Sequence, residues 1–430
     1  MNEQNNEKKV QVPYLRFPEF CDAGSWATPK LGSIGSFTGG GTPSKNNPDY
    51  WSGTNPWVSS SDISEDDIRR MFVGRYISDE AIEKSAAKIV PKNSILLVSR
   101  VGVGKLAVSE APICTSQDFT NFTPNGNDLY FLAYCIKSLK NRLLKFNQGM
   151  AIKGFTKDDI SNLQIPLPSL EEQQKIADCL SSIDELISAE ARKLDALKAH
   201  KKGLMQQLFP AEGETVPRLR FPDFQDAGEW KIYELGALTS KVGSGITPSG
   251  GDKNYKTEGR PFVRSQNIGW GELILDDVVF IDEGMHSSFV ATEIKEFDVL
   301  LNITGASIGR SAVADLRIAG GNVNQHVCII RVEVNKLNPI LLNQFLISEF
   351  GQKQIDSFQA GGNRQGLNFA QIRSFGIPLP PTEIEQGRIA DFLLSLDSLI
   401  VDQGQKLGRL KKHKRGLMQQ LFPVVDEFQE

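Results

Sequence analysis

Two sets of polar residues in this chain have side chains that can read the edges of DNA bases. Arg, Lys, Asn and Gln form the bidentate hydrogen bonds that distinguish guanine from adenine when they lie on turns that reach a groove. A single such residue is more typical of a turn bonded to water or to its own backbone. The sets as wholes favour DNA contact: Lys45, Ser59, Ser60, Arg100, Gln117, Gln148 and Lys153 in the first half, and Arg264, Gln266, Asn267, Asn324, Gln325, His326, Asn363, Arg364 and Gln365 in the second.

A glycine run at Gly39–Gly41, followed by Asn47–Tyr50, invites comparison with the donor-binding and NPPY-type loops of an amino-methylating enzyme. A donor-binding loop must lie between a strand and a helix of a βαβ unit of about 30 residues. Here the two fragments are almost adjacent, and the second half of the chain has no NPxY sequence. The spacing therefore argues against catalysis, and we expect no catalytic and no metal-binding residues.

A second glycine-containing turn, with Gly102, Gly104 and Lys105, resembles a phosphate-binding loop. It lacks the first glycine of that motif and has Leu106 where Ser or Thr would hold Mg²⁺. A turn between two strands is the favoured interpretation. The matching turn of the second half also places a cation, Arg310, after a glycine, so phosphate contacts by Lys105 and Arg310 and plain surface charge remain equally good readings.

Composition places the 430-residue chain among soluble globular proteins, since 40% of its residues are hydrophobic and no apolar run is long enough to cross a membrane. Its first residues are polar and lack the apolar core of a signal peptide, so we expect a cytoplasmic location. A net charge of −4 argues against nonspecific coating of nucleic acid. The five cysteines show no metal or disulfide spacing and are expected to be ordinary thiols.

The chain passes twice through one plan. GLMQQLFP occurs at 203–210 and again at 416–423, and the sequence at 12–32 returns in similar form at 216–236. Each half then has short β-type runs, a helical run (128–146; 338–358) and an extended IPLP segment (165–168; 377–380). We therefore predict an α+β fold: a tail (1–11), a globule (12–168), a long helix (169–210), a linker (211–215), a second globule (216–380), a second long helix (381–423) and a tail (424–430).

Both long helices carry apolar residues at alternating spacings of three and four, as in a coiled-coil seam. Each helix would be about 57 Å long at ~1.5 Å per residue, which suits a spacer. The first seam is Leu180, Ile183, Ile187, Glu190, Leu194, Leu197, Lys201, Leu204 and Leu208, and the second is Leu393, Leu396, Ile400, Gln403, Leu407, Leu410, Lys414, Leu417 and Leu421.

Parallel pairing of these helices would stack Lys201 on Lys414, which is costly once the ammonium groups lose water. We therefore predict antiparallel pairing with Glu190 opposite Lys414 and Lys201 opposite Gln403, which would carry the globules to opposite ends of the spacer. Four matched apolar residues lie outside the seam. They either support the globules or receive partner subunits: Leu186, Met205, Leu399 and Met418.

The repeated frame encloses divergent interiors, as expected of two readers set for different targets. The openings LRFPEF and LRFPDF, the GTPS-like loop, the IPLP-EEQ-KIA and IPLP-IEQ-RIA helix entries and the LMQQLF helix ends occur twice in one order. In these motifs, over almost its whole length, the chain resembles the specificity subunit of a Type I DNA restriction-modification system.

The resemblance implies a non-catalytic subunit with two target-recognition domains, one for each part of a split double-stranded DNA target. It also implies paired helices that dock two methyltransferase subunits, with restriction and translocase subunits completing the complex. S-adenosylmethionine, ATP and Mg²⁺ would then belong to the partners. The alternative is a coiled-coil scaffold whose globules grip polypeptide or carbohydrate; a self-sufficient methyltransferase is a third reading, opposed by the missing donor site.

Overall fold

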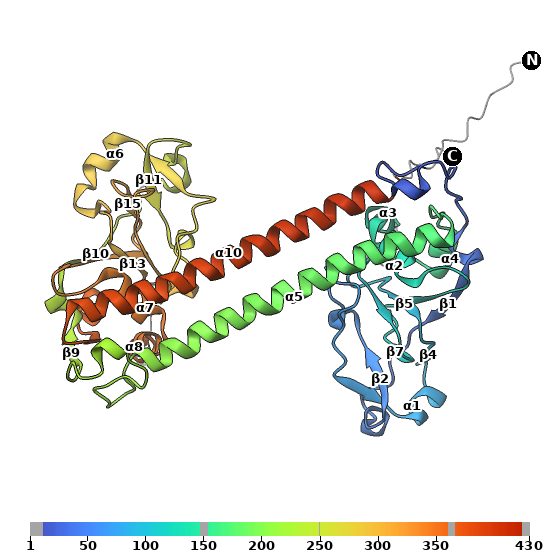
Figure 1. Cartoon of the computed structure of the whole chain (residues 1–430), viewed down its shortest axis with the longest axis horizontal. Coiled ribbons are helices and arrows are strands. Elements are labelled where there is room, and N and C mark those ends of the chain that lie inside the picture. Colours follow the sequence, from blue (N-terminus) through green and yellow to red (C-terminus); the bar gives the residue numbers. More distant parts are fainter. Residues whose placement is uncertain (1–11, 147–153, 249, 360–365, 424–430) are drawn as a thin grey trace, which may run out of the picture. The chain divides into compact units, whose positions relative to one another are not determined.

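The computed structural model describes residues 12–146, 154–248, 250–359 and 366–423. Its contacts divide the chain into two compact units (Figure 1): unit 1 is Met1–Ala191 with Gln405–Glu430, and unit 2 is Arg192–Gly404. Both long helices are divided, so each unit contains part of α5 (Leu170–Leu208) and part of α10 (Glu383–Leu421). Two α+β units that share long helices are the fold class that the sequence predicts.

Unit 1 contains two four-stranded sheets. The first has the order β1-β8-β5-β6 with antiparallel neighbours, and the second has the order β3-β2-β7-β4, in which β2 runs parallel to β7. The strands are β1 (Gly35–Gly39), β2 (Asn55–Val58), β3 (Arg75–Ile77), β4 (Ile89–Val90), β5 (Ser94–Leu97), β6 (Leu106–Ser109), β7 (Ile113–Thr115) and β8 (Thr120–Pro124). The short helices are α1 (Asp79–Lys84), α2 (Leu129–Ser138), α3 (Lys140–Lys145) and α4 (Lys157–Ser161).

Unit 2 repeats this plan. Its four-stranded sheet is β10-β16-β13-β14, its three-stranded sheet is β12-β11-β15 with β11 parallel to β15, and β17 pairs with β9. The strands are β9 (Lys231–Glu234), β10 (Thr239–Ser244), β11 (Arg260–Val263), β12 (Val279–Ile281), β13 (Val299–Asn302), β14 (Ser311–Val313), β15 (Asn322–Val323), β16 (Val327–Val332) and β17 (Gly376–Leu379). The short helices are α6 (Glu283–Ser288), α7 (Pro339–Ile347), α8 (Glu349–Gln359) and α9 (Phe369–Arg373).

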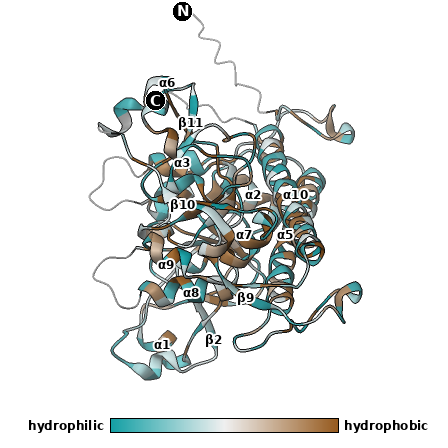
Figure 2. Cartoon of the chain, turned by 90° about the vertical axis from the view of Figure 1, so that its left-hand side faces the viewer, coloured by the Kyte–Doolittle hydropathy of each residue, from teal (hydrophilic) through white to brown (hydrophobic). Residues whose placement is uncertain are grey.

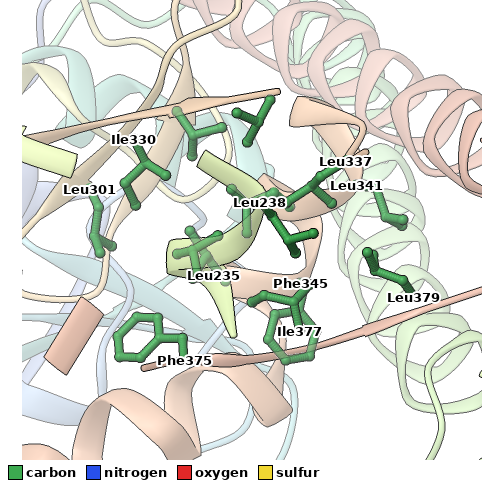
Figure 3. Packing of buried hydrophobic residues seen from close by; sticks show 14 of the residues in the cluster. Leu235, Leu238, Leu301, Ile330, Leu337, Leu341, Phe345, Phe375, Ile377 and Leu379 are labelled. Carbon is green, nitrogen blue, oxygen red and sulfur yellow. The ribbon is translucent and has the colours of Figure 1, made fainter. Parts of the chain in front are cut away.

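The end of each long helix completes a hydrophobic core. In unit 2, Leu208 and Phe209 of the first GLMQQLFP segment are buried in the cluster that surrounds Phe345 of α7 (Figure 3), and the rings of Phe209 and Phe345 lie 5.5 Å apart. In unit 1, Phe422 of the second segment packs 5.5 Å from Phe131 of α2. Burial of one such side chain contributes about 1.5–3 kcal/mol, so the repeated octapeptide is explained by packing.

The start of each long helix is fastened to its own unit by a buried ion pair. The Arg16 guanidinium donates to both carboxylate oxygens of Glu172 at 2.7 Å, and Arg220 donates to both oxygens of Glu385 at 2.7 and 2.8 Å. Both carboxylates are fully buried. Bidentate geometry fixes orientation as well as energy, which accounts for the repeated LRF and EQ motifs.

The glutamine that follows each of these glutamates binds the N-terminus of a core helix, α2 in unit 1 and α7 in unit 2. The Gln173 side chain accepts a hydrogen bond from the backbone amide of Asp128, the N-cap of α2, at 3.0 Å. Gln386 accepts from the backbone amide of Asn338, the N-cap of α7, at 2.9 Å. The same anchor therefore holds α5 in unit 1 and α10 in unit 2.

The two long helices run antiparallel where they meet in unit 1, but the predicted register is wrong. Lys414 binds Asp184 at 2.6 Å, and Glu190 binds Lys406 at 2.6 Å, so Glu190 does not face Lys414. In unit 2, Lys201 binds the Asp397 carboxylate at 2.5 Å. A buried ammonium gains more from a carboxylate than from an amide, and both aspartates lie outside the apolar spacing from which the register was predicted.

Each residue of the predicted seam is buried or half-buried. Figure 2 shows hydrophilic and hydrophobic residues mixed along both long helices. The docking prediction needs correction for two of its four residues. Met205 is buried in the core of unit 2, and Met418 packs against the core of unit 1. They support the units. Leu186 and Leu399 are 43% and 52% exposed and stay available to a partner.

The cysteines and the long helices bear on two further expectations, about thiols and about membrane spans. All five cysteines are free, and burial raises the pKa of Cys114 to about 11 and of Cys328 to about 12. Those two thiols therefore stay protonated near neutral pH. Among the described residues, no helix combines the length and the apolar character needed to cross a bilayer.

Candidate nucleic-acid interface

In both units, the loops that carry predicted base-reading residues leave a pair of parallel strands. The carboxyl ends of parallel strands lie at the same edge, so the loops that follow them are neighbours. In unit 1, Ser116 N donates to Val58 O at 2.9 Å, and in unit 2, Asn324 N donates to Val263 O at 3.0 Å. We call residues 59–62 and 116–118 the loop edge of unit 1, and residues 264–267 and 324–326 the loop edge of unit 2.

A turn from the neighbouring sheet extends each loop edge. Ser99 N donates to Asp118 O at 2.7 Å in unit 1, and Ile303 N donates to His326 O at 3.0 Å in unit 2. These bonds bring the turns 99–105 and 303–310 to the loop edges. The predicted cations Arg100, Lys105 and Arg310 are thus carried by turns that adjoin the loop edges, although sequence separates them widely.

The loop edge of unit 1 contains an ion pair that the sequence did not reveal. Arg75 of β3 donates to the Ser59 hydroxyl at 2.7 Å and also binds the Asp62 carboxylate. Its guanidinium lies over the ring of buried Trp57, 4.6 Å from the centroid. The Ser59 hydroxyl also donates to Asp62 at 2.9 Å. A basic residue next to tyrosine in a strand gives no sequence signal for this position, because its partners come from another strand and loop.

Gln117 is the exposed side chain of this edge that has the chemistry for a base contact. Its amide oxygen accepts a hydrogen bond from Thr42 in the loop that follows β1. That loop also carries Lys45, which is exposed, as is Arg100. Three separate segments of unit 1 therefore bring Arg100, Gln117 and Ser59 to one end of the parallel strand pair. Lys45 follows Ser44, whose backbone oxygen accepts from Trp51 Nε1 at 3.1 Å, in the segment that precedes β2.

In unit 2, Arg264 and Gln266 share one acidic partner. The Arg264 guanidinium donates to the backbone oxygen of Asp277 at 2.7 Å and lies 5.4 Å from the ring centroid of Tyr255. The Gln266 amide donates to the Asp277 carboxylate. Gln266 remains exposed, whereas Arg264 is half-buried with its Nε atom lacking a partner within the described structure. Asp277 therefore orients both side chains at the loop edge.

Three predicted base readers are buried and hold the loops instead. Asn267 is fully buried, its side-chain oxygen accepts from Arg264 N at 2.9 Å, and its amide donates to Asp277 at 2.8 Å. Asn324 is buried and accepts from His326 N at 3.1 Å, and Ser60 is buried in the matching turn of unit 1. The side chains of Asn267 and Asn324 bind backbone groups in tight turns, as Asn often does. The DNA-contact prediction is wrong for these three residues.

Gln325 is exposed at the tip of the second loop edge, next to His326. The His326 Nδ1 atom is 2.6 Å from the Thr304 hydroxyl, which ties this tip to the turn that ends at Arg310. Arg310 itself is half-buried. Five predicted residues lie outside the described part of the chain: Gln148, Lys153, Asn363, Arg364 and Gln365.

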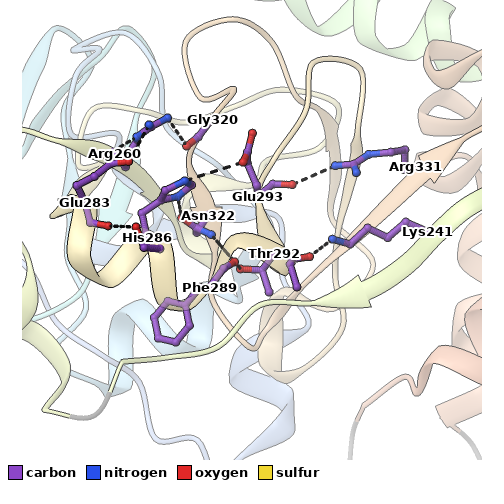
Figure 4. Close-up of polar contacts among 12 residues, drawn as sticks. Lys241, Arg260, Glu283, His286, Phe289, Thr292, Glu293, Gly320, Asn322 and Arg331 are labelled. Atoms are coloured by element: carbon purple, nitrogen blue, oxygen red, sulfur yellow. Dashed lines mark hydrogen bonds and ion pairs between the residues drawn. The ribbon is translucent and has the colours of Figure 1, made fainter.

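A polar network supports the strand from which the second loop edge emerges (Figure 4). The Asn322 Oδ1 atom of β15 accepts a hydrogen bond from His286 Nδ1 at 2.8 Å, and the Asn322 amide nitrogen donates to the Thr292 hydroxyl at 3.0 Å. Asn322 is fully buried and His286 nearly so. Arg331 adds a bidentate pair with Asp298 at 2.7 Å. Buried polar groups that are fully bonded specify one arrangement, so this network fixes the base of the loops.

The glycine run and the glycine turn have structural explanations. A Cβ atom on Gly40 would lie 1.9 Å from Ser116 O, and one on Gly41 would lie 2.0 Å from Ala86 O. Backbone contact therefore requires these glycines. Gly102 and Gly104 have φ angles of +93° and +84° and form the turn between β5 and β6, as the sequence predicts.

The family profile described as "Type I restriction modification DNA specificity domain" matches residues 24–199 and 227–411, one copy in each half. The chain belongs to this family. A relative at 26% identity over 92% of both chains is the Type I restriction enzyme MjaIX specificity subunit of Methanocaldococcus jannaschii. The EcoR124I/EcoR124II specificity subunit of Escherichia coli is 32% identical over 38% of this chain and 42% of its own.

Solved structures show the same fold for the family. The S subunit of a Type I restriction-modification system from M. genitalium superposes with a TM-score of 0.62 at 17% identity, over 96% of this chain and 100% of its own. A chain from a structure of Type I restriction-modification complex assembly gives 0.57 at 18% identity, over 93% and 98%. The family resemblance that the repeated motifs indicate is therefore confirmed.

Proposed function

We propose that this chain is the non-catalytic subunit of a Type I restriction-modification complex and reads a split double-stranded DNA target. The observation that supports this most is the loop edge. It occurs once in each unit, at the end of the equivalent parallel strand pair, and it carries different side chains in the two units. Gln117 in unit 1 and Gln325 in unit 2 are exposed at matching places, each after a strand whose amide ladder fixes the loop. Exposed Gln on a rigid turn suits base recognition in the major groove.

The long helices are proposed to dock two methyltransferase subunits. Exposed Leu186 and Leu399 occupy matching places on α5 and α10 and lie outside the seam. The chain's donor-like loops are explained by packing, so we propose that S-adenosylmethionine, ATP and Mg²⁺ act on the methyltransferase and restriction subunits. The bipartite target would then be methylated by partners that this chain positions.

Exchange of residues 12–168 for the equivalent segment of another family member tests the reading of a split target. The methylation pattern of cells that carry the exchanged chain should change in one part of the target and keep the other part. Simultaneous change of both parts would contradict one reader per unit. A methylome that is identical with and without this gene would instead favour the scaffold alternative.

Docking is tested with Leu186→Glu and Leu399→Glu in the full chain. Each substitution puts a carboxylate on an exposed apolar site, so folding should be unaffected while co-purification with the methyltransferase falls. Phe72→Glu, at a residue of unit 1 that is 71% exposed and far from the helices in sequence, is the matched control. Undiminished co-purification of the helix variants would contradict this docking site.

A further inference from the structure

Unit 2 contains a groove of about 430 Å³ that none of the functions above uses. One wall is the end of α5, where Lys198, Lys202 and Gln206 recur every fourth residue and so share one face of the helix. The opposite wall is the junction between α7 and α8. Trp270, which is 54% exposed, closes the groove on the side of the first loop of the loop edge.

The cations of this groove exceed its anions. Lys198 and Lys202 are exposed, and within the described residues neither has an ion pair. Glu349 is the carboxylate of the groove, and it is already occupied by Lys353 at 3.1 Å and by the Gln206 amide at 2.7 Å. These bonds lower the pKa of Glu349, with the Lys353 hydrogen bond as the largest cause. Lys202 also acts on Glu349 by its charge, but neither Lys202 nor Lys198 forms an ion pair among the described residues, so the groove has more positive than negative charge.

Trp270 supplies an aromatic surface next to these lysines. Its ring has no aromatic or cation partner in the described part of the chain, and its indole N–H can donate but not accept. An exposed indole beside unpaired ammonium groups suits a ligand with negative charge and flat or apolar faces, because the ring covers apolar surface while the N–H and the lysines bind anionic oxygens.

The groove is continuous with the candidate interface. Trp270 lies three residues after Asn267, and it pairs with Ser311, the residue that follows Arg310. Gln352 of the groove donates to Gly309 O at 3.0 Å and so holds the turn that presents Arg310. A strand of DNA that passes the loop edge would therefore meet Arg310 next to the groove.

The matching loop of unit 1 has the opposite charge character. It carries Glu65, which binds Lys140, and Asp66, which lies 3.9 Å from Lys411. Lys411 occupies on α10 the place that Lys198 occupies on α5. The Lys140 hydrogen bond is the largest cause that lowers the pKa of Glu65. In unit 1, a carboxylate therefore lies near Lys411, the cation that the repeated frame supplies.

We propose that the Lys198–Lys202–Trp270 groove binds the sugar-phosphate backbone of the DNA strand beyond the bases that unit 2 reads. This inference rests on the proposed DNA-reading function and adds a backbone contact to unit 2 alone. Lys198 and Lys202 bind two phosphates, and Trp270 packs on the sugars between them. Half or more of the hydrogen bonds in protein–DNA complexes go to the backbone and set position without reading sequence.

The dependence of DNA affinity on salt measures these contacts directly. Each neutralised phosphate contributes about 0.9 to the slope of log K against log salt concentration. In the full chain purified with its methyltransferase subunits, Lys198→Gln with Lys202→Gln should reduce the slope on a duplex of random sequence by about 1.8. Lys193→Gln is the control, since Lys193 is an exposed lysine of the same helix that does not line the groove. Its slope should equal that of the wild type.

Trp270→Ala distinguishes the contribution of the indole ring to DNA binding from that of the lysine charges. Loss of the ring should weaken binding several-fold at fixed salt and leave the slope unchanged, because indole carries no charge. The methylated target sequence should be the same in all these variants, since no base contact is altered.

Each other outcome contradicts the proposal. An unchanged slope in the double lysine variant, with DNA binding and methylation intact, overturns the groove and leaves the proposed function standing. Loss of methyltransferase co-purification at unchanged slope would show that the groove holds an acidic segment of a partner protein. Failure of the wild-type complex to bind any duplex would overturn the proposed function itself.

Discussion

The same lysine–aspartate pair joins the two long helices in each unit, but its surroundings differ. In unit 1, Lys414 and Asp184 are both about 90% or more buried, and the Tyr134 hydroxyl donates to Asp184 at 2.7 Å. In unit 2, Asp397 keeps 29% of its side-chain exposure, and an amide, Gln344, takes the place of the tyrosine. The repeat thus retains the ion pair as the frame and lets the neighbouring helix vary. In unit 1, the charges of the pair are stabilised by protein groups, because water hardly reaches them. In unit 2, water reaches Asp397.

Substitution of each of the two lysines should give the largest difference in stability between the units. Lys414→Met removes the ammonium group that binds buried Asp184 and leaves that carboxylate with the Tyr134 hydroxyl and the charge of nearby Lys137, which forms no hydrogen bond to it. This variant should lower the stability of unit 1 by about 3–5 kcal/mol. Lys201→Met should lower that of unit 2 by about 1–2 kcal/mol, because water can solvate Asp397. Hydrogen exchange of α2 and α7 reports on each unit separately. Equal losses of protection would contradict the assigned difference in solvation.

A second lysine makes unit 1 sensitive to pH. The Lys137 Nζ atom is buried with no hydrogen-bond partner in the described structure, and burial, followed by the charge of Lys414, lowers its pKa from 10.5 to about 8. Asp184, Asp66 and Asp67 act in the opposite direction. The matching residue at the end of α7 is Ile347.

Lys137→Ile should therefore stabilise unit 1 at pH 7 by roughly 3–4 kcal/mol, since the pKa falls by about 2.5 units and each unit corresponds to about 1.4 kcal/mol. The folded pKa lies below the unfolded one, so the unfolded state binds more protons between pH 8 and 10.5, and wild-type stability rises across that window. The advantage of the variant should be complete below pH 8 and shrink toward pH 10.5. Denaturant unfolding of the wild type and of Lys137→Ile at several pH values measures this difference in stability. A difference that does not change with pH would show that the lowered pKa of Lys137 is not its cause.

Substitution of the two exposed glutamines compares the base recognition of the two loop edges. Gln117→Ala and Gln325→Ala should each cost about 1–3 kcal/mol of discrimination at one base pair, in different parts of the target. Methylation of single-mismatch duplexes by the full complex shows which part is relaxed. Relaxation of the same part by both variants would rule out one reader per unit. Asn267→Ala, by contrast, should destabilise its loop, since that side chain is buried.

The smallest expected difference concerns two matching tryptophans. Trp26 Nε1 donates to Glu172 at 3.3 Å, whereas Trp230 Nε1 is buried without a partner among the described residues. Tryptophan to phenylalanine removes similar volume at both places, so the hydrogen bond sets the difference. Trp26→Phe should cost about 1 kcal/mol more than Trp230→Phe. Thermal unfolding of the two variants tests this, and the reverse order would show that Trp230 has the more important contact.

The sequence predicts features of the fold that depend on spacing along the chain. The internal repeat, both long helices and the strand turn at Gly102 and Gly104 follow from periodicity or from glycine. The antiparallel direction follows from the like charges that parallel helices would bring together at Lys201 and Lys414. Helical runs were also predicted correctly, but Leu139 and Ser348 interrupt them, giving α2–α3 and α7–α8. The register of the helices was missed because Asp184 and Asp397 lie outside the apolar spacing.

The candidate interface is harder to predict, because side-chain direction decides it. Gln117 and Gln325 carry the same amide group as Asn267 and Asn324, but the two glutamines are exposed and the two asparagines are buried. Exposure follows from turns that backbone amides close. Arg75 was missed since its partners, Ser59 and Asp62, belong to a different strand end. Residue type identifies the kind of chemistry, whereas the parallel strand pairs determine which residues can carry it.

The packing of Phe422 on Phe131 has a consequence for the order in which the chain folds during synthesis. Unit 2 is one continuous segment, Arg192–Gly404, whereas the core of unit 1 includes Leu421 and Phe422 from the far end of the chain. Domains generally fold as their residues leave the ribosome, from the N-terminus onward. Here unit 1, whose first residues are translated before those of unit 2, is the last that can close, because its core must wait for Leu421 and Phe422 until all of unit 2 has been made.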